Sequence, residues 1–163
     1  MSSVLSANPN DRMGVFKTLE SVPDRYRLSN HAAAFDGRDV WQEYVTESVY
    51  EEWPDATDFF YESVDRAGRR WKEHMAGRSR HHALATPQDV IVWCEQLHAD
   101  LSLNTIYNQY WLRIEGFYSW LQTHADYPHV YHPVLMAVPQ SEIVRKVWNL
   151  KLSGGERKGG VWE

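Results

Sequence analysis

At 163 residues the chain suits one compact domain with tails, and its 43% hydrophobic and 13% aromatic residues are enough for a sizeable core. A net charge of −5 excludes a globally basic polyanion binder, and the lone Cys94 excludes an internal disulfide and fits a reducing compartment. No apolar run approaches the ~20 residues that span a bilayer and no signal peptide opens the chain, so we expect a soluble, cytoplasmic protein with no membrane partner.

The first third of the chain divides into an arm and a helix. Residues 1–37 are rich in Ser, Asn, Asp and Pro, which predicts a partly disordered arm with one short helix around residues 11–20. An acidic helix is predicted over residues 38–53, and Pro54 ends it because the residue before a proline is driven out of the helical region. One face of this helix is apolar: Val40, Trp41, Tyr44, Val45, Val49 and Trp53.

A second helix is predicted from a cap at Asp55 to a stop at Gly77. Its apolar residues recur at helical spacing and form a single stripe: Phe60, Val64, Ala67, Trp71 and Met75. Residues 78–85 are expected to form a loop.

The clearest helix start lies at Thr86, a good N-cap, followed by Pro87 at the first helical position and Asp89 three residues after the cap. The apolar stripe of this third helix consists of Val90, Trp93, Cys94, Leu97 and Leu101. Ser102 can cap a fourth helix almost without an intervening loop. Gly116 inside that helix costs about 1 kcal/mol of helix propensity, which indicates a close crossing with another helix.

The fourth helix, predicted over residues 104–124, carries so many apolar residues that it should be covered on most of its circumference: Ile106, Tyr107, Tyr110, Trp111, Ile114, Phe117, Tyr118 and Leu121. A short helix is predicted over residues 141–150, and the Gly-rich segment 153–160 is predicted to be a flexible tail. The expected fold is all-α with four main helices. The predicted organisation is an arm (1–37), a helical domain (38–138) and a C-terminal helix with tail (139–163).

Basic residues gather in one part of this acidic chain. Between residues 66 and 82 there are six of them and a single acidic residue, Glu73: Arg66, Arg69, Arg70, Lys72, Arg78 and Arg80. The four on the second helix lie off its apolar stripe, so they are expected to face solvent together and to suit a phosphate backbone. The alternative is an ordinary solvated face on which Glu62 and Asp65 pair with these arginines one helical turn away. Charge alone leaves both interpretations open.

No pattern for metal binding or catalysis stands out. His81, His82, His129 and His132 have no Cys-x₂-Cys partner motif, and the single cysteine is on an apolar stripe, where a packing thiol is expected. The glycines of the C-terminal segment follow no strand and open no helix, so they do not predict a phosphate loop. No cofactor and no metal are predicted, and the histidines are assigned to capping, packing and phosphate contacts.

Four segments, taken in order, carry a family resemblance. They read Asp58-Phe-Phe-Tyr with Arg69-Arg-Trp, Thr86-Pro-Gln-Asp-Val-Ile-Val-Trp-Cys, Ser102-Leu-Asn-Thr-Ile-Tyr with Arg113-Ile-Glu-Gly-Phe-Tyr-Ser-Trp-Leu, and Tyr127-Pro-His-Val-Tyr-His-Pro-Val-Leu-Met. Residues from about 55 to 138 resemble the N-terminal core-binding (SAM-like) domain of tyrosine recombinases, the phage-integrase type, particularly archaeal members.

The resemblance implies a four-helix orthogonal bundle that clamps duplex DNA, chiefly through its second and fourth helices. Those helices correspond here to residues 55–76, with the basic residues, and 104–124. The DNA-binding residues that are expected on this basis are Arg66, Arg69, Arg70, Lys72, Arg78, Arg80, His81, Asn104, Thr105, Asn108 and Arg113.

The catalytic half of that family is not matched. The chain contains no His-x-x-Arg motif, and only 25 residues follow Val138. We therefore expect a non-enzymatic DNA-binding protein related to the DNA integration and recombination machinery of mobile elements, either free-standing or the front part of a split integrase. Expected partners are double-stranded DNA and a recombinase catalytic subunit or a second copy. The alternative is a protein-interaction module that uses exposed aromatics such as Trp148 and Trp162 without binding DNA.

Overall fold

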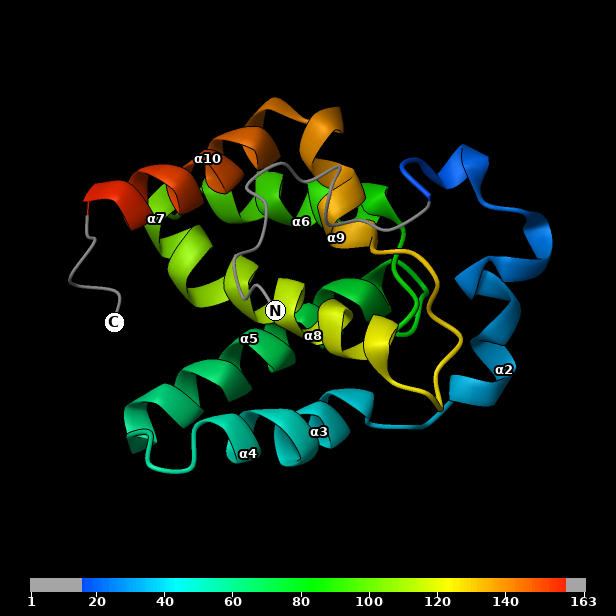
Figure 1. The fold of residues 1–163 in the computed structure, drawn as a ribbon. Helices are drawn as coiled ribbons and strands as arrows, with labels where there is room; N and C mark the ends of the chain where they lie inside the picture. The colour runs from blue at the N-terminus through cyan, green and yellow to red at the C-terminus, as the bar shows by residue number, and fades with distance from the viewer. Residues whose placement is uncertain (1–15, 158–163) are drawn as a thin grey trace, which may run out of the picture.

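The computed structural model describes residues 16–157, with side chains as far as residue 150, and every regular element in that range is helical (Figure 1). The prediction of an all-α fold is confirmed for this part of the chain. No helix within it is long and apolar enough to cross a membrane.

Residues 19–35 of the predicted arm instead form three 3₁₀ turns and a short helix: η1 (Leu19–Ser21), η2 (Asp24–Tyr26), η3 (Leu28–His31) and α2 (Ala32–Phe35). Val22, Leu28 and Phe35 are buried in the common core. The backbone N–H of Leu28 donates a hydrogen bond of 2.9 Å to the hydroxyl of Tyr131, which ties the segment to a residue 103 positions away. Most of the helix predicted over residues 11–20 lies outside the described range.

The helix predicted over residues 38–53 is present as α3 (Val40–Tyr44), the π-helical segment η4 (Val45–Val49) and α4 (Tyr50–Glu52). Asp39 caps it by accepting from the N–H of Gln42 at 3.0 Å, and the chain leaves the helix before Pro54 as predicted. Trp53 differs from the prediction. It lies beyond the last helical residue, with ψ of 56°, so it leaves the apolar face and is 54% exposed.

The next helix, α5 (Asp58–Gly77), buries the predicted stripe of Val64, Ala67, Trp71 and Met75. Its cap is Thr57, whose side chain accepts from the N–H of Phe60, and not Asp55 as predicted. The chain turns after the helix at Ser79, which adopts φ of +61°.

The third predicted helix is α6 (Pro87–His98), and its capping box between Thr86 and Asp89 is confirmed. The fourth consists of α7 (Leu103–Ile106), the π-helical segment η5 (Tyr107–Trp111) and α8 (Leu112–Thr123), with Ser102 as its cap. A Cβ added at Gly116 would lie 2.8 Å from the hydroxyl of Tyr44 in α3, so the predicted close approach at this glycine is confirmed.

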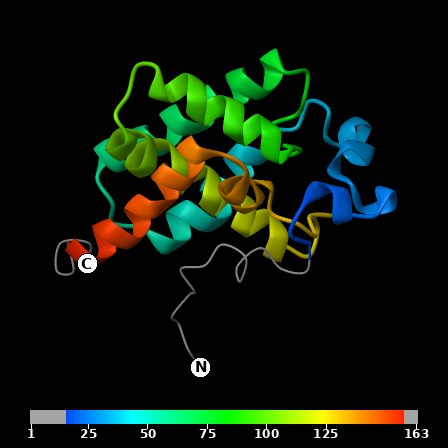
Figure 2. The same ribbon diagram turned by 90° about the horizontal axis from the view of Figure 1, so that it is seen from above.

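Two C-terminal features were not predicted. A short buried helix, α9 (Pro133–Ala137), precedes the 3₁₀ turn η6 (Val138–Gln140). The last helix, α10 (Glu142–Arg157), runs past residue 150, so the prediction of a flexible tail is wrong for residues 153–157. α10 lies beside α6, α7 and η5 (Figures 1 and 2), and its Val144, Val147 and Trp148 are buried.

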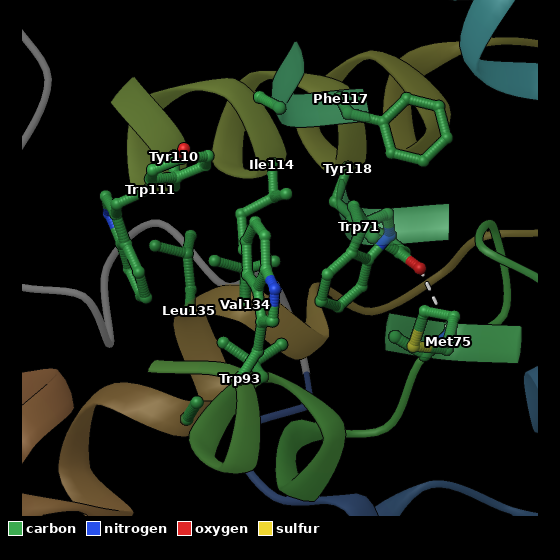
Figure 3. Close-up of a cluster of buried hydrophobic side chains, with 14 of the residues drawn as sticks. Trp71, Met75, Trp93, Tyr110, Trp111, Ile114, Phe117, Tyr118, Val134 and Leu135 are labelled. Atoms are coloured by element: carbon green, nitrogen blue, oxygen red, sulfur yellow. Dashed lines mark hydrogen bonds between the residues drawn. The ribbon is translucent and has the colours of Figure 1, made fainter. Parts of the chain in front are cut away.

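Large aromatic side chains from α5, α6 and α8 meet in the core, as Figure 3 shows for Trp71, Trp93 and Tyr118. The indole N–H of Trp71 and the hydroxyl of Tyr118 both donate to the carbonyl of His82, each at 2.8 Å. The loop after α5 is therefore fastened to the core by side-chain hydrogen bonds. Cys94 is a buried packing thiol as expected, and burial raises its pKa to about 12.

Candidate nucleic-acid interface

Three arginines on α5, which we call the basic strip, lie on the side of the helix away from its buried stripe: Arg66, Arg69 and Arg70. Arg69 is exposed and has neither a hydrogen bond nor an ion pair with any described residue. α5 packs against η5 and α8, and residues of η5 contact Arg66 and Arg70. The strip is therefore bordered by a second helix.

The two other arginines of the basic strip contact neutral groups of η5. Arg66 Nη1 lies 3.4 Å from Oε1 of Gln109, and Arg70 Nη1 donates to the hydroxyl of Tyr110 at 2.9 Å. The Arg70 guanidinium also lies over the Tyr110 ring, 5.4 Å from its centroid. These contacts orient the two guanidinium groups without neutralising them, because neither partner carries a negative charge.

Lys72, Arg78 and Arg80 are each paired with a carboxylate, so three of the six basic residues singled out in the sequence are not free cations in this structure. Lys72 Nζ lies 2.7 Å from Oδ1 of Asp39. Arg80 Nη1 lies 2.8 Å from Oδ1 of Asp89, and Arg78 Nε contacts the same oxygen. Arg78 and Arg80 are drawn to Asp89 because its carboxylate is fully buried and requires cationic or N–H partners close to it.

His81 holds the loop in place and does not extend the basic strip. Its Nε2–H donates to the carbonyl of Arg38 at 2.8 Å, while its Nδ1 accepts from the N–H of Ala83 at 3.0 Å. The ring also stacks on His82, with centroids 4.1 Å apart. Burial lowers the pKa of His81, so the imidazole adds no positive charge near neutral pH.

The four predicted site residues of the fourth helix differ in exposure and in their contacts. Asn104 is exposed and Asn108 half-buried, while the hydroxyl of Thr105 accepts from Ser102 in the cap at 3.1 Å. Arg113 lies mostly inside the protein, with its guanidinium 4.8 Å from the centroid of Phe60 and its Nε atom buried without a hydrogen-bond partner. Burial lowers the pKa of Arg113.

Sequence reasoning missed Gln109 and Tyr110 as neighbours of the basic strip. Tyr110 was assigned to the apolar stripe and Gln109 carries no charge, so neither gave a local signal. The π-helical segment η5 breaks the 3.6-residue period on which such assignments depend.

Exposed acidic residues accompany the basic strip on α5: Glu62, Asp65 and Glu73. The alternative interpretation expects Glu62 and Asp65 to pair with arginines one turn away. No such ion pair is formed between the described residues of α5. The arginines of the basic strip keep their charge, although the acidic neighbours lower the local potential.

The three other histidines considered in the sequence, His82, His129 and His132, serve packing and capping. His132 caps α9 by accepting from the N–H of Leu135 at 3.3 Å, and His129 Nε2 donates to the carbonyl of Ala83 at 2.7 Å. His82 Nε2 accepts from the N–H of Trp41 at 3.2 Å. Within residues 16–150 no group of three or more His, Cys, Asp or Glu side chains is arranged to hold a metal ion.

We expect the free energy of unfolding to fall as the pH drops from 7 to 5. Burial lowers the pKa of His82 to about 3 and that of His129 to about 4, from an ordinary value of 6.5. Below pH 6.5 these histidines are therefore protonated in the unfolded chain but not in the folded protein. This difference lowers the free energy of unfolding by about 2 kcal/mol per histidine at pH 5. Urea unfolding at the two pH values measures the loss.

The matched variant is His82→Gln, whose amide oxygen can still accept from the N–H of Trp41. It should remove about 2 kcal/mol of the pH-dependent loss. A stability that stays level between pH 7 and pH 5 would contradict the neutral, buried state of these two imidazoles.

No protein-family model, curated protein or solved structure matches this chain. The described residues define an all-helical protein with two groups of arginines. One is the basic strip on α5, and the other is the loop pair Arg78 and Arg80, which neutralises the buried carboxylate of Asp89.

Proposed function

We propose that this chain is a non-catalytic DNA-binding module whose basic strip contacts the phosphate backbone of a duplex. One observation carries the proposal: Arg69 has no partner among the described residues and stands between two arginines that are held only by neutral groups. Guanidinium groups with free donors match phosphate oxygens in charge and in geometry. Arg66 lies three residues before Arg69 and four before Arg70, so it is a surface neighbour of both on the helix.

The family resemblance supports duplex DNA as the ligand. On this proposal the four-helix orthogonal bundle of core-binding domains corresponds to the helix over residues 40–52, α5, α6 and the helix over residues 103–123. The second of these carries the basic strip, and the fourth borders it through Gln109 and Tyr110. A recombinase catalytic subunit, supplied separately, is the partner that this reading proposes for cleavage chemistry.

The proposed footprint is smaller than the one expected from the sequence. The six basic residues of the sequence would engage about five phosphates of a duplex. Because Lys72, Arg78 and Arg80 are occupied by carboxylates, about three are engaged instead. The slope of log K against log salt concentration should then be about −2.7, whereas five contacts would give about −4.5.

A salt series tests the proposal. Binding of the full chain to a fluorescein-labelled 20-base-pair duplex is followed by fluorescence anisotropy from low to moderate salt. A slope near −3 supports contacts by the basic strip alone. A slope near −4.5 would show that Lys72, Arg78 and Arg80 leave their carboxylate partners and also contact DNA. Absence of binding at low salt would contradict the proposal.

The alternative, an interaction module that does not bind DNA, loses one of its expected anchors. Trp148 is 3% exposed and packs in the core, with its ring centroid 6.4 Å from that of Trp111. Trp162 lies outside the described residues. Exposed aromatic rings do occur on this protein, but at another place, which we consider next.

A further inference from the structure

Aromatic side chains gather where α4 turns into α5, and we call them the aromatic tip: Tyr50, Trp53, Phe59, Phe60 and Tyr61. Tyr50, Trp53 and Phe59 are 44%, 54% and 69% exposed, which is unusual for side chains of this size. Figure 1 shows the turn at one end of the molecule, on the side away from α6, α9 and α10.

Four of the five rings of the aromatic tip, all but Phe59, contact one another. Ring centroids follow one another at 6.0 Å from Trp53 to Phe60, 5.7 Å from Phe60 to Tyr61 and 5.2 Å from Tyr61 to Tyr50. The Tyr61 hydroxyl donates to the carbonyl of Trp53. Beneath the rings, the Arg113 guanidinium lies against Phe60. A preordered apolar surface loses little conformational entropy when it binds a partner.

The segment that carries the aromatic tip is charged with a single sign, and the one cation at the tip, Arg113, lies beneath the rings. Residues 39–65 contain nine acidic side chains and no lysine, arginine or histidine. Five exposed carboxylates of this stretch, at or beside the tip, form no ion pair with a described residue: Glu51, Glu52, Asp55, Asp58 and Glu62. Such a field repels nucleic acid and attracts cationic groups.

We propose that the aromatic tip docks a lysine- or arginine-rich segment with one apolar face from a partner protein. Exposed Trp and Tyr side chains are the residue types that most often carry binding energy at protein interfaces, and Phe is also enriched there. The carboxylates select a basic partner and exclude an acidic one. The tip occupies the N-terminal end of α5 and the basic strip the middle of the same helix, so the two surfaces use different residues.

The test uses a fluorescein-labelled, 18-residue amphipathic peptide of Leu and Lys, with a Leu and Glu peptide of the same pattern as its counterpart. The Lys peptide should bind in the micromolar range and the Glu peptide should not. Trp53→Ala combined with Phe59→Ala should weaken binding about tenfold or more. Phe59→Ala alone, at a two-thirds exposed position, provides a variant with little effect on folding.

Tyr26→Ala is the matched control, because Tyr26 is a 41% exposed aromatic ring on η2. It should leave binding of the Lys peptide unchanged. Equal binding by the wild type and both tip variants would overturn the proposal, as would failure of the Lys peptide to bind. Sedimentation that shows self-association lost in the tip variants would overturn it in favour of a second copy. Duplex binding unchanged in the tip variants supports separate surfaces.

Discussion

Replacing Asp89 by Ala should lower the free energy of unfolding by about 3–5 kcal/mol, since it strips the partner from two cations at once. Asp89 is 0% exposed and is held by Arg78, Arg80 and the N–H of Thr86, the last at 2.8 Å. The same side chain closes the capping box of α6. Its loss therefore removes a cap and leaves two guanidinium groups partly buried and unpaired.

Urea unfolding of the Asp89→Ala and Asp89→Asn variants measures this effect. The Asn variant keeps an acceptor for the N–H of Thr86 but not the negative charge, so its loss should be smaller than that of the Ala variant. A loss below about 1 kcal/mol in the Ala variant would show that Arg78 and Arg80 are not bound to this carboxylate in solution. They would then be free to join the basic strip.

The second large effect is expected for Gly68→Ala, at about 3 kcal/mol of destabilisation. A Cβ at Gly68 would overlap the indole ring of Trp41. That ring is 3% exposed and packs against Phe117 and Tyr44, with centroids 4.8 Å and 5.4 Å away, so it has little room to shift. The contact fastens α3 to α5.

Gly77→Ala is the matched control, because a Cβ there meets nothing within 4 Å. Alanine also restricts the unfolded chain and is the better helix former, so this variant should be neutral or slightly more stable. Thermal unfolding of both variants gives the comparison. Equal stabilities would mean that α3 does not approach α5 as closely as described.

Local signals predicted the middle of the fold well. The start of α6 depends on residues within one turn of each other, Thr86, Pro87 and Asp89, so the sequence alone specifies it. The same holds for the end of α4 before Pro54 and for the cap at Ser102. Burial of α5 follows from a stripe at regular helical spacing.

Long-range and irregular features escaped prediction. Residues 19–35 bury only three apolar side chains, Val22, Leu28 and Phe35, and their spacing of six and seven residues matches neither a helix nor a strand. The two π-helical segments, η4 and η5, have no signature that distinguishes them from ordinary helix in the sequence. Helix propensity also gave no sign that α10 continues through Gly154 and Gly155.

The candidate site was predicted only in part, for an electrostatic reason. Charge patterning locates basic residues, but it does not show which of them form an ion pair with a carboxylate that is distant in the sequence. Asp89 gave a signal only as a capping residue, and Asp39 gave no signal of its own. Three arginines of the six basic residues remain as the basic strip, on a helix whose N-terminal end carries an acidic, aromatic surface.

The most direct test compares the affinity for a 20-base-pair duplex, at low salt, of the wild type with that of a variant in which Arg66, Arg69 and Arg70 are all Gln. The control is Arg25→Gln, an exposed arginine that lies over the Tyr26 ring on η2. We predict that the triple variant binds at least about tenfold more weakly on any duplex sequence, while the control binds as the wild type does. Equal affinities of the triple variant and the wild type would contradict a DNA-contacting role for the basic strip.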